Sequence, residues 1–409
     1  MINMQRVNSY QKSEPFFFIK SVKTLLFLIL LCLMSVQDAL SQKVKVKKQF
    51  DFIAKQTNYM LEEIQTADQS GGKVSPRTIQ DGKLKMVVSK DWTSGFFPGQ
   101  LWYLYEFTGD DKWLKEAEDF TEKLKKEQYN KGTHDLGFMI FCSYGNGYRL
   151  TKKTEYKDVI IQAAKSLSSR FNPETGLIRS WDHHQDVWKF PVIIDNMMNL
   201  ELLFEATKLS GDSSFYKIAV THANNTLENH FRPDHSSYHV VDYDPQNGEV
   251  RKKMTHQGYA DNSAWARGQA WGLYGYTLCY RETKDAKYLE QANKIAAFIL
   301  DHPNLPKDLI PYWDYNDPAI PNTSRDASAA AITASALYEL DGYTGGENYR
   351  KTADGILYNL SKYYQSPLKE NKGFLLLHST GHRPAKSEID VPINYADYYY
   401  VEALLRSRR

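Results

Sequence analysis

Apolar and polar residues alternate along most of the chain with the period of an amphipathic helix. In residues 113–124 and 288–298, for example, apolar residues recur at steps of three and four, and polar residues fill the positions between them. This spacing places the apolar side chains on one face of a helix and leaves the opposite face in water. A turn followed by an aromatic residue opens five such segments, at Trp113, Tyr156, Tyr216, Tyr288 and Tyr349. The repeat predicts a series of outer helices, each with one wet face.

The segments before these turns have a different pattern. They are rich in Ala, Gly and aromatic residues and nearly free of Lys, at 99–107, 197–209, 268–280, 327–340 and 395–405. A helix that is apolar on every side is buried on every side. With a first outer helix near 50–64, the chain alternates between six outer and six inner helices.

Six helical hairpins in succession predict an all-α domain that closes into a toroid. An open helical solenoid is the alternative. The solenoid is disfavoured by long loops between outer and inner helices, at 231–255, 303–325 and 373–390. Such loops are expected to form short β-hairpin-like structures on one face of the molecule and to carry function.

The charge balance excludes one class of partner. The 409 residues include 51 Lys and Arg against 49 Asp and Glu, without a dense basic run in the body of the chain. Nucleic acid is therefore not expected as a partner, because phosphates are neutralised by clustered basic residues.

The first 41 residues have the features of an export signal. Basic residues precede the apolar stretch 25–34, and small residues follow at Ala39 and Ser41. The stretch is too short to span a bilayer, and Leu31 precedes Cys32 where a lipid-modified cysteine needs a small residue. We therefore expect a signal peptide at 1–41, a single toroidal domain at 42–409, no membrane anchor and a periplasmic location.

Unusual polar residues collect where the inner helices begin. They stand at Asp91-Trp92, His134-Asp135, Asp195-Asn196, Arg267 with Gln269, Arg325-Asp326 and Asn394-Tyr395. In a closed ring the same ends of all inner helices meet on one rim, so these residues are expected to line a single pocket. The alternative for each Asp is an ordinary helix cap. Tryptophans accompany the polar residues, and aromatic walls with carboxylates between them suit carbohydrate.

Two carboxylates, Asp135 and Asp195, precede successive inner helices and are expected to be neighbours across the pocket. Repulsion between them in a partly dry site raises one pKa, as general acid and base chemistry requires. The run Trp181-Asp182-His183-His184 is the best metal candidate, but no third ligand follows at a regular spacing. A Gly-rich phosphate loop after a strand is also missing from the sequence. We expect neither a metal nor a cofactor.

Four motifs resemble those of the unsaturated glucuronyl hydrolases of glycoside hydrolase family 88. They are DWTSGFFPG at 91–99, THDLGF at 133–138, IDNMMN at 194–199 and WARGQAW at 265–271. They occur in the order of the family, and the resemblance covers nearly all of the chain after the leader. It implies an (α/α)6 barrel and an enzyme that acts on the oligosaccharides left by polysaccharide lyases.

The chemistry that the resemblance implies is hydration of the C4–C5 double bond of a terminal 4,5-unsaturated uronic acid. Water added at C5 gives a hemiketal that opens and expels the neighbouring sugar. Asp195 matches the acid/base residue of the family, and Asp135 matches its second essential carboxylate.

The resemblance also places the substrate contacts. Stacking is expected from Trp92, Trp181, Trp265 and Trp271, and polar contacts from His134, His239, Gln257 and Arg267. Arg267 is expected to grip the substrate carboxylate with two hydrogen bonds, and an ion pair with a neighbouring Asp is the alternative. Before the last inner helix, Ser379, Arg383 and Lys386 either bind a sulfate on the next sugar or belong to an ordinary capped loop.

Three other functions fit parts of the sequence. An unsaturated rhamnogalacturonyl hydrolase would use the same fold and chemistry on pectin fragments, but the motif at 265–271 favours the glucuronyl group. An exported sugar-binding protein without chemistry would keep the tryptophans without needing both Asp135 and Asp195. A polysaccharide lyase would create the double bond and not consume it. The substrate source, among chondroitin, hyaluronan, heparin and ulvan, and the oligomeric state stay open.

Overall fold

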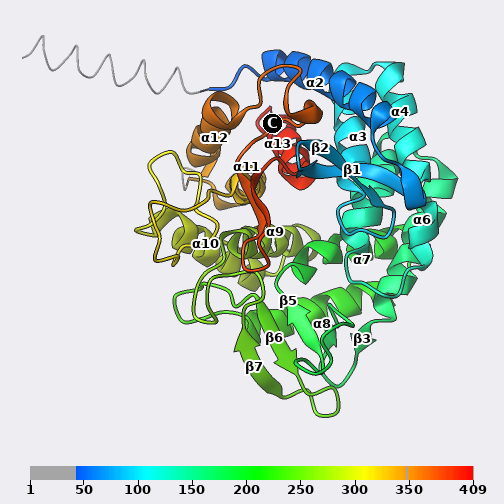
Figure 1. Ribbon diagram of the computed structural model, residues 1–409. Coiled ribbons are helices and arrows are strands. Elements are labelled where there is room, and N and C mark those ends of the chain that lie inside the picture. The colour runs from blue at the N-terminus through cyan, green and yellow to red at the C-terminus, as the bar shows by residue number, and fades with distance from the viewer. Residues whose placement is uncertain (1–42, 347–348, 409) are drawn as a thin grey trace, which may run out of the picture. The chain divides into compact units, whose positions relative to one another are not determined.

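Helices of two kinds alternate along the computed structural model, which describes residues 43–346 and 349–408 (Figure 1). The outer helices are α2 (Val46–Thr66), α4 (Asp111–Glu122), α6 (Thr154–Ser168), α8 (Ser213–Asn229), α10 (Ala286–Asp301) and α12 (Tyr349–Asn359), which η4 (Leu360–Tyr364) extends. The inner helices are α3 (Phe96–Thr108), the π-helix η3 (Gly137–Gly145) continued by α5 (Asn146–Thr151), α7 (Asn196–Ser210), α9 (Ala266–Thr283), α11 (Ala327–Thr344) and α13 (Asn394–Arg406). Short 3-10 turns are η1 (Ser70–Gly72), η2 (Lys125–Tyr129) and η5 (Asn371–Gly373).

The inner helices close into a ring. Each packs against the next, from α3 through η3, α7, α9 and α11 to α13, and α13 packs against α3 again. All residues of α11 from Ala327 to Tyr338 are buried, as expected of a helix that has neighbours on every side. The predicted toroid of six helical hairpins is confirmed, and the open solenoid is wrong because the last inner helix returns to the first.

The repeated turns stop each inner helix and start the next outer one. Five inner helices end at a residue in the left-handed conformation: Gly109, Lys152, Gly211, Lys284 and Gly345. Such a residue lets its N–H return to an unpaired helix carbonyl. In three of the turns the next Asp caps the outer helix, as Asp110 does by accepting from the N–H of Lys112.

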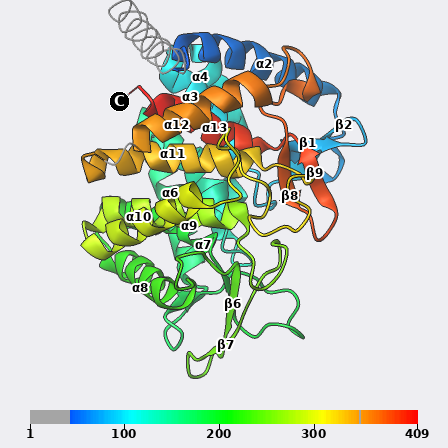
Figure 2. The same cartoon turned by 90° about the vertical axis from the view of Figure 1, so that its left-hand side faces the viewer.

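Four small antiparallel sheets lie on the connections from outer to inner helices. Hairpins pair β1 (Lys73–Gln80) with β2 (Lys83–Val88), β3 (Phe171–Asn172) with β4 (Leu177–Ile178), and β8 (Ser379–His382) with β9 (Ser387–Val391). The third sheet orders β5 (Pro191–Ile193), β6 (Val240–Tyr243) and β7 (Val250–Met254). In Figure 2, β1–β2 and β8–β9 gather at one end of the helices, as the long loops predict. The predicted loop 303–325 forms only isolated bridges, such as Trp265 with Asp314.

From Val44 onward the chain forms one compact unit. The predicted signal peptide at 1–41 lies outside the described residues, so export stays a prediction. Among the helices of residues 43–346 and 349–408, none is long and apolar enough to cross a membrane.

Candidate active site

The N-terminal ends of the inner helices surround a cavity of about 70 Å³. Its lining residues are Trp92, His134, Asp135, Trp181, Ile193, Asp195, Gln257 and Arg267. Seven of these eight are predicted from the sequence, and the eight come from four separate connections between outer and inner helices and from the first turn of α9. The ring therefore brings together residues that lie up to 175 positions apart, from Trp92 to Arg267.

Asp195 stands directly before α7, yet its side chain makes no hydrogen bond that caps the helix. The carboxyl is buried instead, and its Oδ2 atom lies 3.8 Å from Nε2 of His239. Burial raises the pKa of Asp195 to about 7, although Arg267 opposes the shift, and the charge of Asp135 raises the pKa further. At neutral pH this group is therefore able both to donate and to accept a proton.

Asp135 is held by its neighbours in sequence. Its Oδ2 atom accepts from the Thr133 hydroxyl at 2.7 Å, and its Oδ1 atom lies 3.2 Å from Nε2 of His134. On the other side of the ring, Nδ1 of His134 donates to the Ser180 carbonyl oxygen at 2.9 Å, because a carbonyl only accepts. Burial lowers the pKa of His134, although the charge of Asp135 opposes this shift, and the Nε2 atom of His134 has no hydrogen-bond partner.

His239 has one defined neutral tautomer. Its Nδ1 atom accepts from the backbone N–H groups of His256 at 3.1 Å and Gln257 at 3.0 Å. A neutral ring must then carry its proton on Nε2, which faces Asp195. Burial holds the pKa of His239 well below its usual range. Nearby His256, His382 and Arg267 lower this pKa further, each by a smaller amount. His239 therefore presents a hydrogen-bond donor to the Asp195 carboxyl.

Arg267 forms the ion pair that the sequence left as an alternative. Its Nη1 atom lies 2.9 Å from Oδ2 of Asp326, and its Nη groups also donate to the carbonyl oxygens of Thr380 and Gly381. Asp326 in turn caps α11 through the N–H groups of Ser328 and Ala329. The Nε atom of Arg267 has no partner, which leaves one edge of the guanidinium for a ligand.

Five residues that were predicted for the site lie outside the lining. Besides His239 they are Trp265, Trp271, Ser379 and Arg383. Trp265 and Trp271 are buried, and the Trp265 ring supports His239 at 4.6 Å and the Arg267 guanidinium at 4.5 Å. Stacking on a sugar ring is thereby left to Trp92 and Trp181, which are only partly buried.

Ser379 is buried in β8, and its hydroxyl has no hydrogen-bond partner. Arg383 follows β8 at the surface, where it donates to the Ser324 hydroxyl at 3.2 Å and lies 5.5 Å from the Trp313 ring. Neither side chain reaches the cavity.

Several of the buried polar atoms that lack a hydrogen-bond partner lie around the cavity. They include His134 Nε2, Asp195 Oδ2, His239 Nε2, Arg267 Nε, Trp271 Nε1 and Tyr395 Oη. Each such atom costs about 1–3 kcal/mol when it is left unsatisfied, so a protein keeps a cluster of them where a ligand completes the hydrogen bonds. Tyr395 was noted among the polar residues, and its ring lies 5.1 Å from Trp92.

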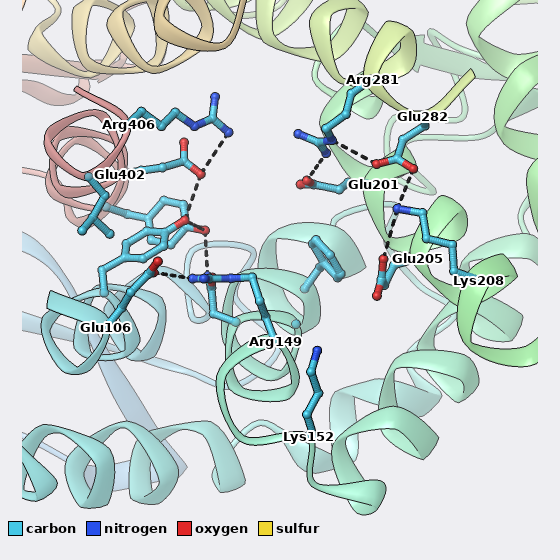
Figure 3. Close-up of a pocket in the computed structure, with 16 residues that line it drawn as sticks. Glu106, Arg149, Lys152, Glu201, Glu205, Lys208, Arg281, Glu282, Glu402 and Arg406 are labelled. Carbon is cyan, nitrogen blue, oxygen red and sulfur yellow. Dashed lines mark hydrogen bonds and ion pairs between the residues drawn. The ribbon is translucent and has the colours of Figure 1, made fainter. Parts of the chain in front are cut away.

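A larger pocket of about 290 Å³ lies at the opposite end of the ring, between the C-terminal halves of the inner helices (Figure 3). Its arginines already have partners: Arg281 pairs with Glu201, Glu282 and Glu339, and Arg406 with Glu339 and Glu402. None of its described lining residues has a buried polar side-chain atom without a partner. This pocket is therefore an ion-pair network, and the small cavity is the candidate active site.

Ile193 could not be predicted as a lining residue, because it is one of several apolar residues in a buried strand. The two histidines of the metal candidate lie next to the lining: the His183 ring is 5.2 Å from that of Trp181, and the His184 ring is 6.1 Å from that of His256. Within residues 43–346 and 349–408, no three His, Cys, Asp or Glu side chains are arranged to hold a metal ion.

Comparison with known proteins extends this picture. An unsaturated glucuronyl hydrolase of Formosa agariphila is 53% identical over 324 residues, which cover 79% of this chain and 81% of that protein. The crystal structure of an unsaturated glucuronyl hydrolase specific for heparin has a TM-score of 0.82 and 48% identity, and the match covers 87% of this chain and 97% of the other.

A third relative was solved with a ligand. It is a mutant unsaturated glucuronyl hydrolase of Streptococcus agalactiae complexed with dGlcA-GalNAc6S, with a TM-score of 0.74, 27% identity and coverage of 90% and 93%. Comparison with protein families matches residues 53–406 to Glycosyl Hydrolase Family 88. The match spans almost every described residue and includes all of the cavity, and it shows that this chain belongs to Glycosyl Hydrolase Family 88.

Proposed function

We propose that this chain is an unsaturated glucuronyl hydrolase. It removes a 4,5-unsaturated uronic acid from the non-reducing end of oligosaccharides that polysaccharide lyases have produced. The observation that carries the proposal is the buried carboxyl of Asp195, with a pKa raised to about 7, in a cavity surrounded by polar atoms that lack partners. The names of the relatives support it.

The reaction adds one molecule of water to the double bond. Asp195 in its acid form gives a proton to C4, and positive charge develops at C5 and the ring oxygen. Water then adds to C5 and returns a proton to the Asp195 carboxylate, so the enzyme ends as it began. The product at C5 is a hemiketal, which opens and releases the neighbouring sugar.

The remaining residues bind substrate or stabilise charge. Asp135 lies close enough to raise the pKa of Asp195 and carries negative charge that stabilises the cationic transition state. Arg267 offers its free Nε–H to the substrate carboxylate, while Trp92 and Trp181 provide ring faces for the sugar. Gln257 and the His134–Asp135 pair supply further polar contacts at the lining.

The substrate class is a lyase-generated fragment of a glycosaminoglycan or of ulvan. One relative is named for heparin, and another was solved with an N-acetylgalactosamine derivative in the second position. We place the enzyme in the periplasm, after removal of residues 1–41, because the leader has the pattern of a signal peptide.

The test follows the ultraviolet absorbance of the conjugated uronate over time, with purified protein and a panel of lyase-generated disaccharides. A fall in absorbance together with release of a free reducing sugar is expected. A rise on intact polysaccharide would indicate a lyase instead. Turnover of unsaturated rhamnogalacturonan fragments alone would move the enzyme to pectin, and binding without any turnover would make it a sugar-binding protein.

A further inference from the structure

Asn199 lies on α7 four residues after Asp195, at the place where this helix packs against η3. Its side chain is fully buried and does not line the cavity. It belongs to the motif at 194–199, yet the chemistry described above does not use it. A buried polar side chain needs hydrogen-bond partners, and those of Asn199 point to its role.

The side-chain amide of Asn199 joins the two segments that carry the aspartates. Its Oδ1 atom accepts from the backbone N–H of Phe138 at 3.1 Å, three residues after Asp135. Its Nδ2 atom donates to the carbonyl oxygen of Asp195 at 3.5 Å, which is a long hydrogen bond. Phe138 lies in the first turn of η3, where backbone N–H groups commonly lack a carbonyl partner. Asn199 therefore caps η3 from the neighbouring inner helix.

Close packing holds the same two segments together. A Cβ atom on Gly137 would lie 2.7 Å from the Cα atom of Asn199 and 2.7 Å from its Oδ1 atom. Side chains essentially never approach backbone atoms this closely, so only glycine permits α7 and η3 to meet here. The hydrogen bond from Phe138 and this contact together fix the start of η3 against the start of α7.

An asparagine suits this position better than other residues of similar size. The Phe138 N–H needs an acceptor and the Asp195 carbonyl can take a donor, and a side-chain amide supplies one of each. An ionised aspartate accepts but does not donate, and a leucine does neither. The Asp195 carbonyl also accepts from the N–H of Met198 at 3.0 Å, so the acceptor is the more important half of the amide.

The two carboxylates that these segments carry repel each other. Both line the same small cavity, and the charge of Asp135 raises the pKa of Asp195. This repulsion acts to separate the segments, and the side chain of Asn199 opposes the separation. The other titratable or charged groups that face Asp195 are Arg267 and His239, which are held by other parts of the chain. Replacing Asn199 therefore changes chiefly the contribution of Asp135.

We propose that Asn199 is a positioning residue that sets the spacing between the acid/base carboxyl of Asp195 and the carboxylate of Asp135. This inference rests on the proposed function, because it explains how the two groups that perform the chemistry are held together. Without this side chain the carboxylates move apart. Asp135 then stabilises the cationic transition state less, and Asp195 loses part of the repulsion that keeps its proton available near neutral pH.

The first experiment measures kcat and KM of Asn199→Ala on an unsaturated disaccharide across a range of pH. We expect kcat to fall about 10- to 100-fold with KM within about twofold of the wild type, since a displacement of about 1 Å costs about this much. The pH at which kcat/KM is half lost on the alkaline side should also move down, because the pKa of Asp195 is raised less.

Asn199→Asp is the conservative variant. It keeps an acceptor for the Phe138 N–H, so most of kcat should return. Its added negative charge should raise, and not lower, the pH at which activity is lost. Should Asn199→Ala fail to fold, this variant decides the matter alone: a low kcat together with loss of activity at a lower pH than in the wild type would overturn the proposal.

The matched control is Asn146→Ala. Asn146 is a buried asparagine at the other end of the ring, where its Nδ2 atom donates to the Cys142 carbonyl oxygen at 3.0 Å and to the Tyr398 hydroxyl oxygen at 3.2 Å. Its replacement should lower stability but leave kcat, KM and the pH profile unchanged. The same outcome for Asn199→Ala would make Asn199 a purely structural residue. A raised KM with an unchanged pH profile would assign it to substrate binding, and either result would overturn the proposal.

The second experiment does not depend on turnover. Denaturant unfolding compares Asn199→Ala with Asn199→Ala/Asp195→Asn over a range of pH. In the wild-type background, Asp195→Asn should gain relative stability up to about pH 7, and in the Asn199→Ala background this gain should end at a lower pH. The same end point in both backgrounds would contradict the role of Asn199. Absence of turnover by the wild type on any unsaturated disaccharide would instead contradict the proposed function, so the two failures are distinguishable.

Discussion

Two aspartates at equivalent positions, Asp195 before α7 and Asp326 before α11, have opposite surroundings. Asp326 caps its helix and pairs with Arg267, so its carboxylate oxygens already have hydrogen-bond and ion-pair partners. Asp195 makes no capping hydrogen bond and is buried, with its Oδ2 atom unpartnered. The environment, and not the residue type, therefore decides which carboxyl keeps a proton available for chemistry.

Replacing Asp195 by Asn should remove the proton donor and acceptor but preserve the shape of the site. We expect kcat to fall by about 10²- to 10⁴-fold, with KM close to the wild-type value, because general acid and base catalysis contributes about this much. Absorbance kinetics on an unsaturated disaccharide measure both constants. Asp212→Asn, at the exposed cap of α8, is the matched control and should leave kcat unchanged. Near-normal turnover by Asp195→Asn would remove the assignment.

The pKa of Asp195 also sets a direction for the pH dependence of activity. Because burial raises this pKa to about 7, the acid form dominates below about pH 7 and is lost above it. We expect kcat/KM for an unsulfated disaccharide to decrease as the pH rises through this value. A profile that rises through the same range would mean that the carboxylate form starts the reaction.

The same shift affects stability. Between the usual carboxyl pKa of about 3.9 and the raised value, the folded protein holds a proton that the unfolded chain has released. The contribution of Asp195 to stability therefore decreases as the pH rises through this window. Denaturant unfolding of the wild type and of Asp195→Asn should show the variant gaining stability relative to the wild type up to about pH 7. A constant difference at every pH would contradict the raised pKa.

At the scale of elements, close backbone contact between the starts of neighbouring inner helices positions the site. A Cβ atom on Gly95, just before α3, would lie 2.1 Å from the carbonyl oxygen of Phe138 and 2.4 Å from that of Met139. Only glycine permits this approach between α3 and η3. The approach places Trp92 5.5 Å from the Phe138 ring, three residues after Asp135.

Gly95→Ala should push α3 and η3 apart, because the atoms it meets belong to the backbone and cannot rotate away. We expect a loss of about 1–3 kcal/mol in the free energy of unfolding together with a raised KM. Gly342→Ala within α11 is the matched control, since its Cβ would meet nothing within 4 Å. The control should gain up to about 1 kcal/mol from better helix propensity. Chemical denaturation measures the free energy of unfolding of both variants. A Gly95→Ala variant as stable as the wild type would contradict the close contact between α3 and η3.

At the scale of the whole molecule, the closed ring separates two kinds of polar chemistry. Its N-terminal end holds the cavity with unpartnered polar atoms, and its C-terminal end holds the ion-pair network drawn in Figure 3. Glu402 accepts hydrogen bonds from Tyr103, Tyr274 and Ser335 and pairs with Arg406. It thereby joins three inner helices, α3, α9 and α11, to its own helix α13.

Glu402→Gln should lower the free energy of unfolding by about 1–3 kcal/mol, because a neutral amide weakens the hydrogen bonds that the carboxylate accepts from three buried hydroxyls, while Arg406 keeps its ion pair with Glu339. KM and kcat measured well below the unfolding temperature should stay near the wild-type values, since the network lies at the far end of the ring from Asp195. Lys47→Ala is the control, as its pair with Asp51 is exposed and should contribute little. A large change in KM without loss of stability would show that the far end communicates with the cavity.

Much of the architecture could be predicted because it depends on patterns within single segments. The period of apolar residues distinguishes outer from inner helices, and the repeated turns mark their ends. Closure of six hairpins then forces the starts of the inner helices onto one rim, which is why the sequence predicts that Asp135, Asp195 and Trp92 line one cavity.

What the tertiary structure alone decided involves residues that are far apart in the chain. Arg267 pairs with Asp326 and donates to the carbonyl oxygen of Gly381, which is 114 positions away. The sequence alone therefore could not decide between an ion pair with an Asp and a role in binding the substrate carboxylate. The burial of Trp265 and Trp271 and the contacts of His256 with His184 and His382 likewise depend on how separate loops fold over the rim. The pattern of apolar residues determines which faces of a helix must be buried. Which residues bury those faces depends on the closure of the ring and the packing of its loops, which bring distant segments together.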